Sequence, residues 1–407
     1  MVAPKHKPRV AVVSPFLDKS FGTERMVIEW ISRLSAEFEI HVYSQHVQDL
    51  DLSTIIWHRI PKLSGPHLFN FLWWFAANHF WRVWDVRVRR LRHDLVFSPG
   101  ANCFDADAVS IHIVFAEFMR RVGKDLKFAR NSVWTWPRLL HRRVYYHLII
   151  LLERHIYKNP QTQLILTSGN TAAELERFYG RTGSFPILYA GIDHEAFNPA
   201  HCRALREETR NTLGLLDGQF VLLLIGNDWR KKGLLALLDA LTELRGLPIR
   251  LLVVTREMDA ALRTLVQEKH LDEIVRFLPP RKNVEHYFAA ADAYVGPSLE
   301  DTYALPAVEA MACGLPVIIS SRAGASGVVT DGVDALILKD PTDAIELSGL
   351  IRQLYGDASF RKRLGERAAA TACKFTWESN AHDLAEIFNQ ILRRKSQPAS
   401  DTLVQQS

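Results

Sequence analysis

The chain has 407 residues, which exceeds the roughly 100–200 residues of one ordinary domain. With 48% hydrophobic and 23% charged residues, its composition excludes a largely disordered or fibrous protein. The formal net charge is +5, but residues 1–200 carry 25 Lys and Arg against 18 Asp and Glu, whereas residues 201–407 carry 25 against 27, so the two halves differ in charge.

Short apolar runs alternate with helical patterns in the first half of the chain. The runs are almost continuously apolar, as expected for strands buried on both faces of a parallel sheet. Between the first two runs, Val27, Trp30, Ile31 and Leu34 form one apolar face with helical spacing. We expect strands at 9–14, 40–44, 95–98, 109–114 and 164–168.

A second series of the same kind follows a polar, helix-competent stretch at 198–214. Two such series predict an α/β protein with two doubly wound, Rossmann-like domains, at 1–190 and 191–375, followed by a helix at 376–395 and a disordered tail at 396–407. Ligands of such sheets bind beyond the carboxyl ends of the strands, so two facing domains would form a cleft. The strands expected in the second series are 220–226, 250–255, 275–278, 293–297 and 317–320.

The segment 293–320 predicts an anion site. A strand leads into a polar loop, and a helix at 307–313 follows, with Pro306 suited to its first turn and Gly314 suited to its end. A helix N-terminus presents free N–H groups and the positive end of the helix dipole. Asp301 in the loop and Glu309 in the helix would flank a pocket of phosphate size.

Several motifs resemble those of retaining GT-B glycosyltransferases of family GT4, and within it those of the lipopolysaccharide-core glucosyltransferases. The resemblance implies a first domain that binds the acceptor, a second that binds a nucleotide sugar, and a C-terminal helix that packs back on the first domain. The motifs are SFGTER (20–25), LILTSGNTAAELERFYG (164–180), GIDHEAFNP (191–199), GNDWRKKG (226–233) and PSLEDTYALPAVEAMACGLPVI (297–318).

The resemblance implies three catalytic positions. Asp301 would contact hydroxyls of the transferred sugar, although the family usually has Glu there and the adjacent Glu300 could take this role. Lys232 would neutralise the charge that develops on the diphosphate as the sugar leaves. His112 would face the sugar from the first domain; a buried core histidine is the competing interpretation.

The other implied positions bind the donor. Glu309 would accept hydrogen bonds from the ribose hydroxyls, and Lys231 would assist Lys232 at the diphosphate. Asn227 stands where many relatives have Arg, and Phe21 stands where many have a first glycine of a pair. The donor-binding residues that the resemblance implies are Gly22, Thr23, Lys231, Arg281 beside the base, Ala304, Leu305 and Glu309.

The implied reaction moves a sugar from a nucleotide diphosphosugar to a hydroxyl of a glycan or glycolipid, with retention of configuration. The leaving phosphate oxygen would take the acceptor proton on the same face. We expect no metal and no other cofactor, no nucleic acid as partner, and a cytoplasmic location, since no apolar stretch suits a signal peptide or a membrane span. The base, the sugar, the acceptor, the linkage and the oligomeric state stay open.

Other functions remain open at this point. The strings Asp105-Ala106-Asp107 and Asp49-Leu50-Asp51 could hold a divalent cation, as in metal-dependent glycosyltransferases of another fold. A sugar-nucleotide epimerase or a phosphorylase would share the two-domain architecture. The alternative in which the protein is not an enzyme is a catalytically impaired nucleotide-sugar binder that acts as a partner subunit.

Two segments suggest an anionic membrane surface as a partner, at the inner face of the membrane. Residues 69–84 are rich in Phe and Trp and are followed by Arg87, Arg89, Arg90 and Arg92. Residues 119–158 combine ten Lys and Arg with interleaved aromatic residues. Aromatic and basic residues together favour the bilayer interface. Burial of the aromatic residues in a core and a solvated basic helix face are the competing interpretations.

Overall fold

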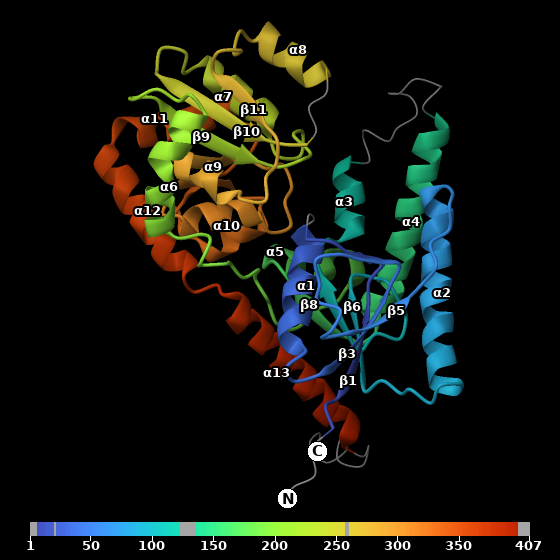
Figure 1. The fold of residues 1–407 in the computed structure, drawn as a ribbon. Helices are drawn as coiled ribbons and strands as arrows, with labels where there is room; N and C mark the ends of the chain where they lie inside the picture. Colours follow the sequence, from blue (N-terminus) through green and yellow to red (C-terminus); the bar gives the residue numbers. More distant parts are fainter. Residues whose placement is uncertain (1–5, 20–21, 123–135, 257–259, 398–407) are drawn as a thin grey trace, which may run out of the picture. The chain divides into compact units, whose positions relative to one another are not determined.

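The computed structural model describes residues 6–19, 22–122, 136–256 and 260–397 (Figure 1). The chain forms two compact units, one of Met1–Leu188 with Trp377–Ser407 and one of Tyr189–Thr376. The boundaries fall close to the expected ones at 190 and 375. The expected tail begins at 396, but Ser396 ends a helix, and the tail from 398 onward lies outside the described residues.

The first unit contains a six-stranded, entirely parallel sheet in the order β5-β3-β1-β6-β7-β8. All five expected strands are present, although the one expected at 109–114 ends at Ile111, where the chain turns into a loop. The strands are β1 (Arg9–Val13), β3 (Glu39–Ser44), β5 (Ile56–Arg59), β6 (Leu95–Pro99), β7 (Ala108–Ile111) and β8 (Gln163–Leu166), with a separate pair β2 (Phe16–Leu17) and β4 (His46–Val47).

The C-terminal helix α13 (Trp377–Ser396) belongs to the first unit, where it packs on α1 (Gly22–Leu34) and β6 (Figure 1). The predicted apolar face of α1 is buried. Its Trp30 donates an indole hydrogen bond to Asn380, and Arg33 pairs with Glu378 at 2.7 Å. The other helices of this unit are α2 (His67–Arg87), α3 (Phe115–Val122), α4 (Trp136–Lys158) and α5 (Asn170–Tyr179).

The aromatic-rich segment forms α2, which packs beside α4 through ring contacts such as Phe71 on Tyr145 at 5.3 Å (Figure 1). Trp74 is buried, whereas Phe69, Phe80 and Trp84 are each about half exposed or more, at 66%, 57% and 48%. One face of α2 therefore packs in the core, and the other face leaves apolar side chains exposed. Among the described residues, no helix combines the length and the apolarity that crossing a membrane requires.

The second unit repeats the same topology, with a parallel sheet in the order β11-β10-β9-β12-β13-β14. In both sheets the strand order reverses between the first and the fourth strand of the series. Ligands of doubly wound sheets bind beyond the carboxyl ends of the strands at such a point. The strands are β9 (Phe220–Ile225), β10 (Ile249–Val254), β11 (Val275–Leu278), β12 (Ala293–Gly296), β13 (Val317–Ser320) and β14 (Leu336–Leu338).

The helices of the second unit cover a core built largely of Leu, Ile and Val from the strands and helix faces. The polar stretch at 198–214 forms α6 (Pro199–Thr212), with the Asn198 side chain accepting the N–H of His201 as an N-cap. The remaining helices are α7 (Leu234–Thr242), α8 (Ala260–Glu268), α9 (Glu285–Ala290), α10 (Leu305–Ala312), the 3₁₀ turn η3 (Gly324–Val328), α11 (Ala344–Gly356) and α12 (Ala358–Ala372).

Candidate active site

The loop between β9 and α7 is closely joined to the loop after β12. Gly233 has a φ of +73°, and a Cβ atom there would lie 1.8 Å from the carbonyl oxygen of Pro297. The N–H of Leu299 donates to the carbonyl of Lys231 at 2.8 Å. Only glycine allows this approach, since any side chain at 233 would overlap backbone and strain a left-handed conformation. The two loops therefore meet beyond the carboxyl ends of β9 and β12.

Lys232 and Asp301 form an ion pair between these loops. Their side chains are 22% and 14% exposed, so both are shielded from bulk water. The second carboxylate oxygen of Asp301 accepts the N–H of Ala304 at 2.9 Å. Asp301 is therefore the acid of the loop that the structure shows paired with this lysine. Lys231 is 46% exposed, and its Nζ lies 3.9 Å from Asp228.

Helix α10 begins at this point without a side-chain cap. Ala304, its N-cap residue, has φ 67° and ψ 53°, a left-handed conformation that costs a non-glycine residue roughly 1–2 kcal/mol. Pro306 lies in the first turn, as predicted, and has no N–H. Asp301 accepts the N–H of Ala304, so Leu305 supplies the next donor along the chain. The positive end of the helix dipole thus lies beside the Lys232–Asp301 pair.

Glu309 lies one turn inside α10 and is 4% exposed. Burial raises the pKa of the Tyr294 phenol in β12 above its ordinary range, and the negative charges of Asp301 and Glu309 raise it further. Two carboxylates, one lysine and a helix N-terminus therefore occupy the switch point of this sheet. The arrangement can hold an anion and can accept hydrogen bonds from hydroxyls.

Arg281 lies apart from this group, after β11 at the outer edge of the sheet. Its guanidinium lies 5.6 Å from the centroid of the Tyr287 ring. The structure therefore places Lys232, Asp301, Ala304, Leu305 and Glu309 together, with Lys231 beside them, and leaves Arg281 two strands from β9.

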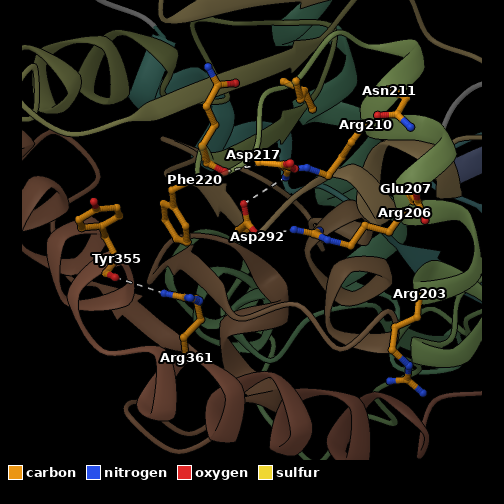
Figure 2. A pocket seen from close by; sticks show the side chains of 13 residues that line it. Arg203, Arg206, Glu207, Arg210, Asn211, Asp217, Phe220, Asp292, Tyr355 and Arg361 are labelled. Atoms are coloured by element: carbon orange, nitrogen blue, oxygen red, sulfur yellow. Dashed lines mark hydrogen bonds and ion pairs between the residues drawn. The ribbon is translucent and has the colours of Figure 1, made fainter.

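A cavity of the same unit, of about 540 Å³, is rich in arginine (Figure 2). It includes Phe220, the first residue of β9, and so lies at the amino ends of the strands. Arg206 donates to the carbonyl of Ala291 at 2.6 Å and pairs with Asp292 at 2.6 Å. Arg210 donates to the carbonyl of Ala290 at 3.0 Å.

The carbonyls of Ala290 and Ala291 lie at the C-terminal end of α9, where the last carbonyl groups have no partner within the helix. The two arginines supply the missing hydrogen-bond donors. Arg361 similarly donates to the carbonyl of Leu354 near the end of α11, at 2.6 Å. In Figure 2, Asp292 lies between Arg206 and Arg210. Because these guanidinium groups already bind backbone and carboxylate, the cavity is a structural network rather than a phosphate site.

In the first unit, Gly22 and Thr23 form the start of α1. A Cβ atom on Gly22 would meet no atom of the described residues within 4 Å, so packing against them does not require glycine there. Ser20 and Phe21, the start of the SFGTER motif, lie outside the described residues. Thr23 lines a cavity of about 620 Å³ beyond the carboxyl ends of β1, β6 and β7.

His112 follows β7, is 8% exposed and also lines this cavity. Its Nε2 lies 3.1 Å from the Ser110 hydroxyl, and its ring centroid lies 6.2 Å from that of Trp30. Burial lowers the pKa of His112 to about 4. The ring is therefore neutral at pH 7 and can hydrogen-bond a sugar hydroxyl, but it does not supply a positive charge.

Glu153 of α4 also lines the cavity, and the sequence analysis did not single it out. Each of its carboxylate oxygens accepts the N–H of Phe115 at 3.1 Å, and one accepts the Tyr179 hydroxyl. Burial raises the pKa of Glu153 to about 7 despite these bonds. The side chain holds the N-terminus of α3, which follows the loop that carries His112.

Comparison with known proteins relates the second unit to a family of glycosyltransferases. The family model described as Glycosyl transferases group 1 matches residues 206–371, almost all of the second unit. The second unit is therefore similar to the group 1 glycosyltransferases. The D-inositol 3-phosphate glycosyltransferase of Corynebacterium jeikeium is 29% identical over 254 residues, which cover 59% of this chain and 60% of that protein. The chain thus spans about 60% of the length of that relative.

Solved structures show that this chain has the GT-B fold. WaaG, a glycosyltransferase involved in lipopolysaccharide biosynthesis, aligns with a TM-score of 0.76 at 20% identity, over 93% of this chain and 99% of that one. Anabaena HepE, solved in complex with UDP-glucose, aligns with a TM-score of 0.68 at 18% identity, over 94% and 99%. The expected fold class is confirmed.

The metal-site hypothesis for the Asp-x-Asp strings is not supported by their partners. Asp105 forms an ion pair with Arg82, and Asp107 pairs with Lys395 at 2.7 Å and accepts the N–H of Val96. Asp51 accepts the N–H and the hydroxyl of Ser53. In the described part of the chain, no cluster of three or more His, Cys, Asp or Glu suits a metal ion.

The ring of His112 is expected to stay uncharged throughout the neutral range. Because its pKa is lowered, the folded state favours the neutral ring, and the stability gained from it is complete above about pH 6.5 and is lost as the pH falls toward 4. NMR of histidine-labelled protein, assigned with a His112→Ala variant, should give a titration midpoint near 4. A midpoint between 6 and 7 would contradict this description of the site.

Proposed function

We propose that the protein transfers a sugar from a nucleoside diphosphate sugar to a hydroxyl of a glycan or glycolipid, with retention of configuration. The observation that supports this most is the Lys232–Asp301 pair at the N-terminus of α10, with Glu309 buried one turn further on. A cation and a helix dipole attract a diphosphate, while carboxylates accept hydrogen bonds from ribose and sugar hydroxyls.

The proposed chemistry depends on charge and position rather than on a general base. As the bond between the anomeric carbon and the phosphate oxygen breaks, negative charge grows on the diphosphate, and Lys232 stabilises it together with the start of α10. The leaving phosphate oxygen takes the proton of the acceptor hydroxyl. Asp301 orients the sugar, and no protein carboxylate forms a covalent intermediate. The donor site uses no metal ion and no other cofactor.

The donor is a nucleoside diphosphate sugar of the kind that HepE contains, and UDP-glucose is the first one to test. D-inositol 3-phosphate, named in the curated relatives, is the first acceptor to compare. Gly22, Thr23 and Arg281 remain positions that the resemblance assigns to donor binding. Incubation with UDP-glucose and an acceptor should release UDP only when the acceptor is present. Binding without acceptor-dependent turnover would instead support a partner subunit, and conversion of the sugar nucleotide without acceptor would support an epimerase.

Replacing the buried carboxylate of α10 should weaken donor binding. We expect Glu309→Gln to raise the dissociation constant for UDP-glucose by about 10- to 100-fold, because hydrogen bonds to a charged group contribute roughly 1.5–3 kcal/mol. Isothermal titration calorimetry measures this directly. Glu300→Gln is the matched comparison, since it removes a carboxylate of the neighbouring loop and leaves α10 and the Lys232–Asp301 pair intact, and its effect should stay within about twofold.

We propose that the protein binds its acceptor at an anionic membrane surface. Exposed apolar side chains on the neighbouring helices α2 and α4 include Phe80, Trp84, Leu140 and Leu151. Arg142, which is also exposed, supplies basic charge on α4. Apolar and basic side chains on one surface favour docking at a bilayer interface. Part of the basic stretch, residues 123–135, lies outside the described residues.

A further inference from the structure

The loop that leads into α10 is bound through its carbonyl groups to η3, the turn that follows β13. The N–H of Gly324 donates to the carbonyl of Asp301 at 3.0 Å, and the N–H of Ala325 donates to the carbonyl of Tyr303 at 2.8 Å. Within the described chain, no hydrogen bond uses the N–H of Tyr303 or of Leu305. The loop therefore has its acceptors satisfied and keeps two backbone donors available beside the start of α10.

The side chain of Tyr303 is fully engaged within the protein. The residue is 6% exposed, and its ring stacks on that of Tyr189, with 5.9 Å between the centroids and 28° between the planes. Its hydroxyl donates to the carbonyl of Ala190 at 3.4 Å. Burial, with a smaller contribution from Tyr189, raises the pKa of Tyr303 above its ordinary range, so the hydroxyl keeps its proton. This side chain therefore anchors the loop and is not offered to a substrate.

Tyr189, the partner of Tyr303, lies where the chain enters the second unit, which begins at Tyr189 and ends at Thr376. Its ring packs edge-on against Phe375 with 6.0 Å between the centroids. The N–H of Ile192 donates to the carbonyl of Phe375 at 3.1 Å, and a parallel bridge joins Ile192 to Thr376. The first and the last segment of the unit thus hold each other, and they form a fixed base for the Tyr303 ring.

The residue after Tyr303 needs such support. Ala304 has a left-handed φ of 67°, and helix α10 has no side-chain cap. Strained backbone of this kind persists only where the surrounding contacts determine it. Asp301 accepts the N–H of Ala304 at 2.9 Å, and the Tyr303 ring fixes the residue directly before it. Loss of either contact leaves the start of α10 less well determined.

We propose that Tyr303 is a positioning residue for glycosyl transfer, because its ring, packed on Tyr189, holds the backbone at the start of α10 in the geometry that the donor diphosphate requires. The proposal rests on the proposed function. Tyr303 acts through the backbone N–H groups of the loop and does not touch the substrate. Groups that stabilise developing charge are effective when they are preorganised, so a small displacement of this backbone should lower kcat more than it weakens UDP binding.

Steady-state kinetics with UDP-glucose and calorimetry with UDP test this role. Tyr303→Leu removes the ring and should lower kcat by about tenfold or more, while the dissociation constant for UDP rises less than about threefold. Tyr303→Phe keeps the ring and loses only the hydroxyl contact of 3.4 Å, so its kcat should stay within about twofold. Equal kcat of Tyr303→Leu and the unmodified protein would overturn the proposal.

Tyr355→Leu is the matched control for the general effect of losing a ring contact. Tyr355 packs on Phe220 with 5.7 Å between the centroids, and it lies in the same unit at the amino ends of the strands. A purely structural role predicts that Tyr355→Leu and Tyr303→Leu lower the melting temperature and leave kcat unchanged. The positioning role predicts that only Tyr303→Leu lowers kcat, and an equal loss of kcat in both variants would contradict it.

A double-mutant cycle tests whether the ring acts through its partner. Tyr189→Leu should lower kcat by about as much as Tyr303→Leu, and the double variant should lower it little further, because each change removes the same contact. A loss in the double variant that equals the product of the two single losses would show that the rings act independently and would overturn the proposal. Tyr189→Leu also tests the contact if Tyr303→Leu does not fold.

Hydrogen exchange on the full chain measures the loop without any activity. The N–H groups of Ala304 and Ala307, bonded to Asp301 and Ala304, should exchange about tenfold faster in Tyr303→Leu and at the unmodified rate in Tyr355→Leu. Unchanged exchange in Tyr303→Leu would contradict the assignment. Failure of the unmodified protein to bind UDP would instead contradict the proposed function, because the exchange rates do not depend on a donor.

Discussion

Replacement of Lys232 by alanine is expected to lower kcat by about 100- to 1,000-fold, the effect of removing one preorganised group that stabilises charge in a transition state. The lysine is mostly buried and is paired with Asp301, so its ammonium group is held in place before the donor arrives. Because the negative charge on the diphosphate grows as the bond breaks, kcat should fall more than donor affinity. Steady-state kinetics with UDP-glucose and calorimetry of UDP separate these effects.

Lys231→Ala is the matched comparison, since it removes the same charge one residue away. Its side chain is 46% exposed, and its Nζ is 3.9 Å from Asp228, so we expect a loss of less than about tenfold. The difference in kcat between the Lys232→Ala and Lys231→Ala variants is the result that tests the assignment. A Lys232→Ala variant that keeps kcat within about tenfold of the unmodified protein would contradict the assignment.

The second large effect should come from Gly233→Ala, which is expected to destabilise the second unit by about 4 kcal/mol or more. The added Cβ would lie 1.8 Å from the carbonyl oxygen of Pro297, and the left-handed φ of +73° adds strain. For a unit of this size, such a loss lowers the melting temperature by about 8 °C or more. Thermal unfolding followed by circular dichroism measures it.

Gly246→Ala provides the control within the same unit. This glycine has no positive φ, and a Cβ there would meet nothing within 4 Å. Its replacement should change the melting temperature by no more than about 2 °C. Equal stability of the Gly233→Ala and Gly246→Ala variants would show that the loops after β9 and β12 do not touch as described.

Much of the fold could be predicted from the sequence because the strands of both sheets are buried on both faces and are therefore continuously apolar. Strands β11 and β13 were predicted to the residue. The missed strands were short or mixed in character: β5 is IWHR with two exposed residues, and β14 has three residues. Periodicity carries little information over such lengths.

The contacts within the site could not be derived from spacing. Lys232 and Asp301 are 69 residues apart, and only the parallel pairing of β9 with β12 brings their loops together. The resemblance placed both in one donor site, but it did not predict their ion pair. Which of Glu300 and Asp301 pairs with the lysine depends on loop geometry that composition does not determine.

The residues that line the cavity of the first unit could also not be predicted from the sequence. Trp74 lies within an aromatic-rich segment in which a buried ring and an exposed ring look alike. Glu24 follows directly on Thr23 in the SFGTER motif, yet its partial burial follows only from the packing of α1. A similar case is that of Cys202 and Cys313, which are far apart in sequence and line the same cavity.

A crystal structure with bound UDP tests the central claim most directly. The account predicts that the diphosphate lies within hydrogen-bonding distance of Lys232 Nζ and of the backbone at the start of α10, with the ribose hydroxyls on Glu309. A diphosphate bound instead among Arg203, Arg206, Arg210 and Arg361, in the cavity of Figure 2, would contradict it.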